Sequence, residues 1–151
     1  MSEEIIKKIE KKVKEFFGKM GYEIELKISK KDNIFKIDIQ TKDFTDLIGE
    51  KGKTLSEIQH ILNAILKKEI KEEFYLDLDI GGYKERKIKY LKELAKSVAD
   101  EVALTKKEKI LEPMPAYERR VIHLELASRP DVTTESIGRE PKRRVVIKPY
   151  P

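Results

Sequence analysis

Two short clusters have residue types and spacings that suit contact with phosphate groups. The first is Gly49-Glu50-Lys51-Gly52, which places two glycines three residues apart and is followed by Lys53. Glycine has no Cβ, so the backbone can turn sharply and approach a ligand closely. Backbone amides at the start of a following helix can then face an anionic phosphate backbone. The alternative reading is an ordinary tight turn between two helices.

The second cluster is Arg119-Arg120-Val121-Ile122-His123. Residues four apart share one face of a helix, so Arg119 and His123 can present a cation and a ring together. Arginine can hold a phosphate, and histidine can donate to it or stack on a base. Arg143 and Arg144 would extend this basic surface if their segment lies beside the helix. The alternative reading is a solvated helix edge.

A ribonuclease is the enzyme that such a pair could serve, with histidine as general base and arginine stabilising the phosphorane. The general acid is missing, because the chain has only His60 and His123, and Glu118 and Glu125 fall on other helix faces. We therefore expect no catalytic residues. The chain has no cysteine and its two histidines lie far apart, so we also expect no metal site and no cofactor.

The charge distribution favours nucleic acid as the partner. Residues 1–82 carry 16 Lys and no Arg against 17 acidic residues, a net −1, whereas residues 83–151 carry 17 Lys and Arg against 11 acidic residues, a net +6. All seven arginines lie in the second part. Arginine suits bidentate phosphate contacts and stacking on bases, so the asymmetry indicates an anionic partner.

The hydrophobic pattern predicts elements that position the two clusters. Spacings of three and four indicate helices, and alternation indicates strands. In the first half we expect a helix over 3–20, strands over 22–28 and 35–39, a short helix N-capped by Asp43, a helix from Thr54 and a strand over 74–80. In the second half we expect a helix over 83–105, a short strand at 110–111, a helix over 116–127 and strands over 132–137 and 143–148.

Some side chains are expected to have structural roles. We expect His60 to be partly buried beside the apolar face of its helix, and Asp77 and Asp79 to point outward from a solvated strand face without binding an ion. Three tyrosines are candidates for stacking on bases or, alternatively, for partial burial at the junction of the two halves: Tyr83, Tyr90 and Tyr117.

The order αββααβ, with the GxxG loop between two helices, resembles the type II KH domain. That resemblance implies that the loop clamps the backbone of a few single-stranded nucleotides. It assigns RNA binding to Ile48, Gly49, Glu50, Lys51, Gly52 and Lys53, although Glu50 departs from the basic or neutral residue often found there. It also implies an apolar groove for bases, with contributions from Ile48, Leu55 and either Ile37 or Ile39.

The Arg-x-x-x-His spacing, preceded by Glu112-Pro113-Met114 and followed by a strand over 143–147, resembles the R-three-H domain. The resemblance implies single-stranded nucleic-acid binding by Arg119 and His123, with Arg120, Arg143 and Arg144 beside them. The predicted fold class is therefore α+β. A KH domain over 1–82 precedes an R-three-H domain over 83–151, whose first helix, 83–105, connects the two.

The two modules together resemble the bacterial Jag family of SpoIIIJ-associated proteins over nearly the whole chain. The resemblance implies a cytoplasmic RNA-binding protein that takes part in post-transcriptional control of growth, division or the cell envelope, and a second small KH protein as a partner. Single-stranded DNA stays open as a ligand. Many members carry a further N-terminal domain and linker, which these 151 residues do not include. No export signal and no membrane span are expected. The alternative is a ribosome-assembly or scaffold factor that docks on structured RNA.

Overall fold

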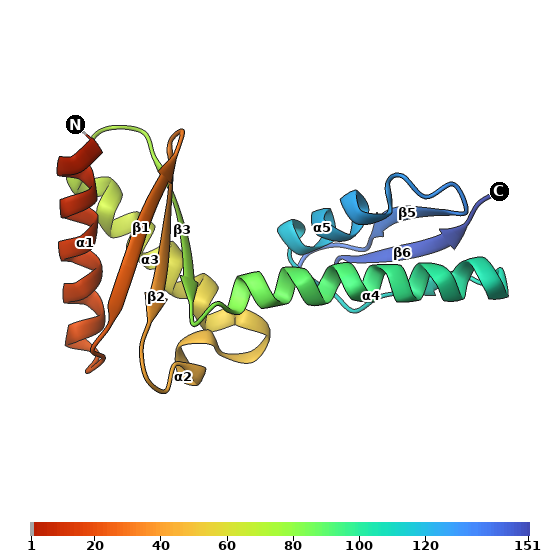
Figure 1. Ribbon diagram of the computed structural model, residues 1–151, viewed down its shortest axis with the longest axis horizontal. Coiled ribbons are helices and arrows are strands. Elements are labelled where there is room, and N and C mark those ends of the chain that lie inside the picture. The colour runs from red at the N-terminus through yellow and green to blue at the C-terminus, as the bar shows by residue number, and fades with distance from the viewer. Residues whose placement is uncertain (1) are drawn as a thin grey trace. The chain divides into compact units, whose positions relative to one another are not determined.

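The computed structural model describes residues 2–151, which divide into a first compact unit ending at Lys84 and a second beginning at Glu85. The elements of the first unit, in chain order, are α1 (Ser2–Lys19), β1 (Glu25–Lys31), β2 (Ile34–Gln40), α2 (Thr45–Ile48), a 3-10 turn (Glu50–Gly52), α3 (Lys53–Glu69) and β3 (Tyr75–Ile80). Those of the second are α4 (Tyr83–Thr105), which begins two residues before the boundary, β4 (Lys109–Ile110), α5 (Ala116–Leu126), β5 (Val132–Ile137) and β6 (Arg144–Pro149). The predicted α+β class is confirmed (Figure 1).

The first unit is a three-stranded sheet with two long helices packed on it. β2 is central, antiparallel to β1 and parallel to β3. Alternation along β2 sends Phe35, Ile37 and Ile39 into the core, where they meet the apolar faces of α1 and α3. A parallel β2–β3 pair requires a long crossover connection, and here the crossover is the segment that contains α2, the glycine loop and α3. The topology therefore places the glycine loop inside the crossover.

The second unit is an antiparallel sheet in the order β4-β6-β5, with a core shared by α4, α5 and the sheet. Val145 and Ile147 of β6 are fully buried against Ala95 and Val102 of α4 and Ile122 of α5. The hairpin between β5 and β6 turns through Gly138, whose φ of +85° lies in the left-handed region. This hairpin carries most of the arginines that follow α5.

Three expectations about individual side chains are wrong. Asp43 does not cap the short helix: it has a φ of +52°, and the N-cap is Phe44, which makes no side-chain cap bond. His60 is exposed on α3. Asp79 is buried, with an exposed fraction of 4%, because it turns inward to accept bonds from the backbone that leaves the strand.

Within residues 2–151, no helix combines the length and apolar character that crossing a membrane requires. The same residues hold no cluster of three or more acidic or histidine side chains arranged for a metal ion.

Candidate nucleic-acid interface

The glycine loop has a backbone that other residues rarely adopt. Gly49 has φ 72° and ψ −178°, Lys51 has φ 55° and ψ 26°, and Gly52 has φ 78° and ψ 14°. The conformation of Gly49 is essentially restricted to glycine, and that of Gly52 is left-handed. Space imposes the same restriction, since a Cβ on Gly49 would overlap the side chain of Thr54. Gly49 is therefore required by conformation and by space, and the left-handed conformation at Gly52 favours glycine.

This loop leads directly into α3, which begins without a side-chain cap. Gly52 is the N-cap residue and offers no side chain to the first amides of the helix. These amides and the positive end of the helix dipole favour an anion. Glu50, Lys51 and Lys53 are exposed at the loop, whereas Ile48 is buried, with an exposed fraction of 8%. The N–H groups of Gly49 and Gly52 already donate to the carbonyls of Thr45 and Gly49, so the loop itself presents two lysines and one carboxylate to solvent.

The expected apolar groove beside the loop is not formed by the residues assigned to it. Ile37 and Ile39 are 0% exposed and Leu55 is 1% exposed, all within the core of the first unit. Ile37 and Ile39 face inward because α1 and α3 pack on that side of the sheet, and Leu55 faces the same core from α3. Their side chains belong to the core and do not line an open surface.

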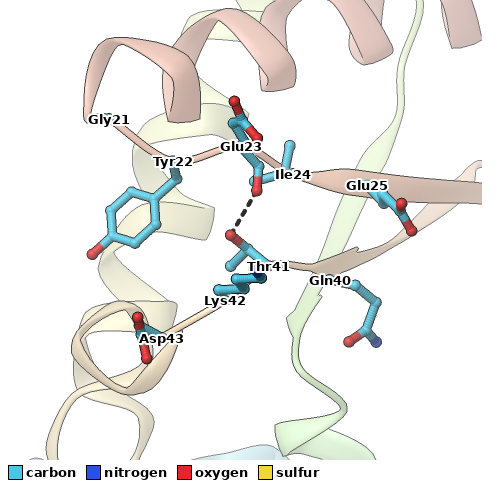
Figure 2. A pocket seen from close by; sticks show the side chains of 9 residues that line it. All are labelled: Gly21, Tyr22, Glu23, Ile24, Glu25, Gln40, Thr41, Lys42 and Asp43. Carbon is cyan, nitrogen blue, oxygen red and sulfur yellow. Dashed lines mark hydrogen bonds between the residues drawn. The ribbon is translucent and has the colours of Figure 1, made fainter.

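A hollow of about 660 Å³ lies where β1 begins and β2 ends, at the end of the strand pair from which the chain continues into α2, and it is lined by residues 21–25 and 40–43 (Figure 2). Thr41 Oγ1 donates a hydrogen bond of 2.7 Å to the carbonyl of Glu23 across it. Its charged residues are three carboxylates, Glu23, Glu25 and Asp43, and one lysine, Lys42. This charge balance does not suit a phosphate backbone.

In the second unit, the Arg-x-x-x-His pair is directed into the protein. Arg119 has an exposed fraction of 8%, and its Nη1 donates to the Met114 carbonyl at 2.8 Å and to Glu140 Oε1 at 3.1 Å. Arg119 thereby ties α5 to the segment before it and to the β5–β6 hairpin. Sequence spacing correctly places Arg119 and His123 on one helix but gives no sign that Arg119 is buried.

His123 is held by two hydroxyl groups of β5. Its Nδ1 lies 2.7 Å from Thr134 Oγ1 and its Nε2 lies 2.9 Å from Ser136 Oγ. A neutral imidazole donates from one nitrogen and accepts at the other, and hydroxyl groups can satisfy both. Burial lowers the pKa of His123 below its usual range, and the positive charge of Arg119 lowers that pKa further. With both ring nitrogens engaged, His123 is poorly placed as the general base of a nuclease.

The other predicted arginines lie at the surface of α5 and of the hairpin. Arg120 is exposed on α5. Arg143 Nη1 donates to the Gly138 carbonyl at 2.7 Å, and Arg144 Nε donates to the Lys142 carbonyl at 3.1 Å. Each guanidinium has five N–H groups, so one such bond orients it and leaves donor capacity for a phosphate. Hairpin residues Arg139 and Lys142, both exposed, extend the basic surface beyond the residues predicted from the sequence.

Comparison with known families finds one family model for each half of the chain. Residues 6–78 match the model of the KhpA/KhpB KH domain, and residues 89–149 match the model of the R-three-H domain. The chain belongs to the Jag family. This outcome confirms the resemblance inferred from the GxxG and Arg-x-x-x-His motifs, and it confirms the R-three-H assignment of the second module.

Three curated relatives carry the name RNA-binding protein KhpB. The protein from Clostridium symbiosum is 34% identical over 128 residues, covering 85% of this chain and 58% of the relative. The protein from Lactiplantibacillus plantarum is 42% identical over 101 residues, covering 67% and 31%. The protein from Bacillus subtilis is 33% identical over 103 residues, covering 67% and 50%. The matched part of this Jag-family chain thus spans from about a third to under three fifths of their lengths.

The hydrogen bonds of His123 predict a pH-dependent stability of the second unit. The pKa of His123 is lower in the folded state than in the unfolded state, where it is near 6.5. The contribution of neutral His123 to the free energy of unfolding is therefore fully present above about pH 6.5 and is lost as the pH falls below this value. Thermal unfolding followed by circular dichroism at pH 7.5, 6.5 and 5.5 should show a larger loss of stability for the native chain than for His123→Gln. His60→Gln, at an exposed site, should behave like the native chain. Equal pH dependence in the native chain and His123→Gln would contradict this role.

Proposed function

We propose that this chain binds single-stranded RNA through both units and catalyses no reaction. The observation that carries the proposal is the glycine loop, whose left-handed backbone at Lys51 and Gly52 precedes the uncapped N-terminus of α3. The turn ends at the first amides of α3, which have no side-chain cap and can face a phosphate. The name of the KhpB relatives supports RNA as the ligand.

In the first unit, the proposed contacts come from residues 48–53. Gly49 and Gly52 give the loop its backbone conformation, Lys51 and Lys53 attract phosphate, and Ile48 is buried next to the loop in the sequence. Glu50 is exposed and repels phosphate, so we expect this loop alone to bind weakly.

In the second unit, we propose that Arg120 of α5 and Arg143 and Arg144 of the β5–β6 hairpin contact the nucleic acid. Arg119 and His123 hold α5 against this hairpin. Two weak sites in one chain raise each other's effective concentration when a strand reaches both. We further propose a cytoplasmic role in post-transcriptional control, with a second small KH protein as partner, which the KhpA/KhpB family name supports.

The test is fluorescence anisotropy of a labelled single-stranded RNA titrated across a salt series, with single-stranded DNA, duplex DNA and a folded RNA stem as comparisons. Each phosphate neutralised on a single strand adds about −0.7 to the slope of log affinity against log salt. The variant Lys51→Glu/Lys53→Glu should weaken RNA binding more than tenfold. Its matched control, Lys68→Glu/Lys71→Glu, makes the same charge change at exposed positions at and beyond the other end of α3.

Four outcomes decide the proposal. Tighter binding of single-stranded RNA than of duplex DNA, lost in the loop variant and kept in the control, supports it. Equal losses in both variants would mean that only net charge matters. Binding of the folded stem without binding of the single strand would favour docking on structured RNA. Cleavage of the labelled RNA on prolonged incubation would overturn the assignment of a non-catalytic role.

A further inference from the structure

The side chain of Tyr83 lies directly against the glycine loop. A Cβ placed on Gly52 would come within 2.9 Å of Tyr83 Cε2 and 3.3 Å of its Oη. The hydroxyl-bearing edge of the ring therefore covers the Cα of Gly52. Tyr83 is also partly buried against the core of the first unit. This residue follows the αββααβ elements and is the first residue of α4.

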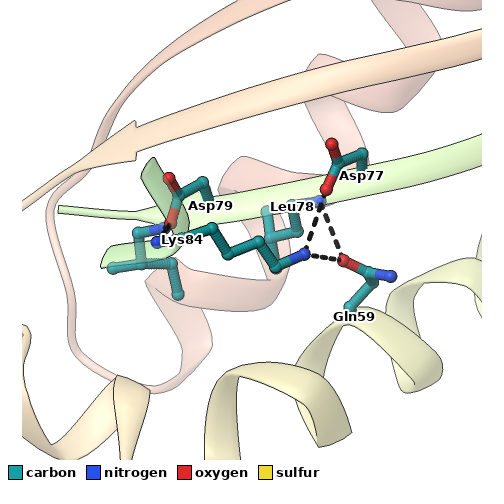
Figure 3. Close-up of polar contacts among 6 residues, drawn as sticks. Gln59, Asp77, Leu78, Asp79 and Lys84 are labelled. Carbon is teal, nitrogen blue, oxygen red and sulfur yellow. Dashed lines mark hydrogen bonds and ion pairs between the residues drawn. The ribbon is translucent and has the colours of Figure 1, made fainter. Parts of the chain in front are cut away.

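The first turn of α4 is fixed to the sheet and to α3 by a polar network (Figure 3). Buried Asp79 accepts hydrogen bonds of 2.9 Å from the backbone N–H of Ile80 and of Lys84 through its Oδ1. Lys84 Nζ donates to Asp77 Oδ1 at 3.0 Å and to Gln59 Oε1 at 2.6 Å. Gln59 lies on α3, the helix that the glycine loop starts. The network thus holds Tyr83 in a set position relative to the loop.

The two glycines of the loop are each covered by one side chain. Thr54 covers Gly49 and Tyr83 covers Gly52. Lys51, between the two glycines, has a left-handed φ of 55°, a conformation that a non-glycine residue keeps only where surrounding contacts enforce it. Thr54 belongs to α3 itself, whereas Tyr83 reaches the loop from outside the helix–loop–helix segment.

We infer that Tyr83 is a positioning residue of the nucleic-acid site: its ring braces Gly52 and keeps the loop ready to bind a phosphate. The inference rests on the proposed function and adds to the site a residue from the following helix. A loop already held in its binding conformation does not lose ordering entropy when the strand arrives. Without the ring, the loop would lose conformational entropy when it binds the strand, and the affinity would be lower.

The experiment compares Tyr83→Leu and Tyr83→Phe in the full chain, with Tyr90→Leu as the control for the loop resonances alone. Tyr90 is a tyrosine on the same helix with an exposed fraction of 54%. We expect Tyr83→Leu to weaken RNA binding about 5- to 10-fold with an unchanged salt slope, because no phosphate-binding cation is removed. Tyr83→Phe keeps the ring and should bind within about twofold of the native chain. The amide NMR resonances of residues 50–53 should shift in Tyr83→Leu and stay in place in Tyr90→Leu.

A double-mutant cycle with Gly52→Ala tests the contact directly. The added methyl group would press against the ring, so Gly52→Ala alone should weaken binding and should cost less when combined with Tyr83→Leu. The positive φ of Gly52 strains alanine with or without the ring, so the coupling between the two substitutions is the informative quantity, and zero coupling would contradict the contact.

The outcomes separate the inference from the proposed function. If the native chain binds no single-stranded RNA, the proposed function itself fails. If Lys51→Glu/Lys53→Glu loses binding while Tyr83→Leu retains both affinity and loop resonances, only the inference is overturned. An equal loss in Tyr83→Phe and Tyr83→Leu would also overturn it, because the hydroxyl group and not the packing of the ring would then be responsible.

Discussion

Gly49→Ala is expected to remove most RNA binding by the first unit and to destabilise that unit by about 2 to 3 kcal/mol, the cost of forcing a side chain into a rare backbone conformation. The φ of +72° and ψ of −178° at Gly49 disfavour every other residue. Its new Cβ would also come within 3.0 Å of the Thr54 backbone nitrogen at the start of α3. Relief of this contact must displace the loop from α3. Anisotropy at low salt should show an affinity loss of at least about tenfold, equivalent to about 1.4 kcal/mol.

Gly18→Ala is the matched control. Gly18 lies in α1, and a Cβ there would meet nothing within 4 Å. Alanine is favoured over glycine in a helix by about 0.5 to 1 kcal/mol, so this variant should be more stable and should bind RNA normally. If Gly49→Ala matched Gly18→Ala in both measurements, the loop backbone would have no role in binding.

Alanine substitutions of two neighbouring arginines on α5 are expected to have different effects, one on stability and the other on RNA affinity. Arg119→Ala removes a buried guanidinium that bonds the Met114 carbonyl and Glu140, so it should destabilise the second unit by about 2 kcal/mol, typical for hydrogen bonds to a charged group. Arg120→Ala changes an exposed side chain and should leave the melting temperature nearly unchanged. It should instead weaken RNA binding and reduce the salt slope by about 0.7, the loss of one phosphate contact.

Thermal unfolding and salt-dependent anisotropy of both variants check this prediction. Arg119→Lys extends it, because lysine keeps the charge but cannot reproduce the planar fork of N–H groups, so it should recover only part of the lost stability. If Arg119→Ala kept the native melting temperature and lost as much salt slope as Arg120→Ala, Arg119 would contact the nucleic acid directly.

The order of elements can be predicted from the sequence because it depends on local patterns. The prediction of a helix over 83–105 agrees with α4 at Tyr83–Thr105, since apolar residues at spacings of three and four mark its whole length. Strand β5 likewise matches its prediction over 132–137. The two motifs are recognisable for the same reason: GxxG and Arg-x-x-x-His are each confined to one turn or one helix.

Long-range partners of the site residues escape prediction because no local pattern encodes them. Alternation predicts an outward strand residue at Asp79, yet its carboxylate caps α4 across the turn at Gly81-Gly82. The usual cap signal places the capping residue next to the first turn, and Asp79 lies four residues before Tyr83. The partners of His123, Thr134 and Ser136, are likewise eleven and thirteen residues away on β5.

The sequence by itself determined the αββααβ order, the GxxG turn, the basic second half and the family, because these depend on residue type and near-neighbour spacing. Only the tertiary structure decided which charged and aromatic side chains face solvent. It turned Arg119 inward onto Glu140 and brought Tyr83 onto Gly52. The physical reason is that burial and pairing depend on which elements pack together, and those contacts join residues 21 and 31 positions apart in the chain.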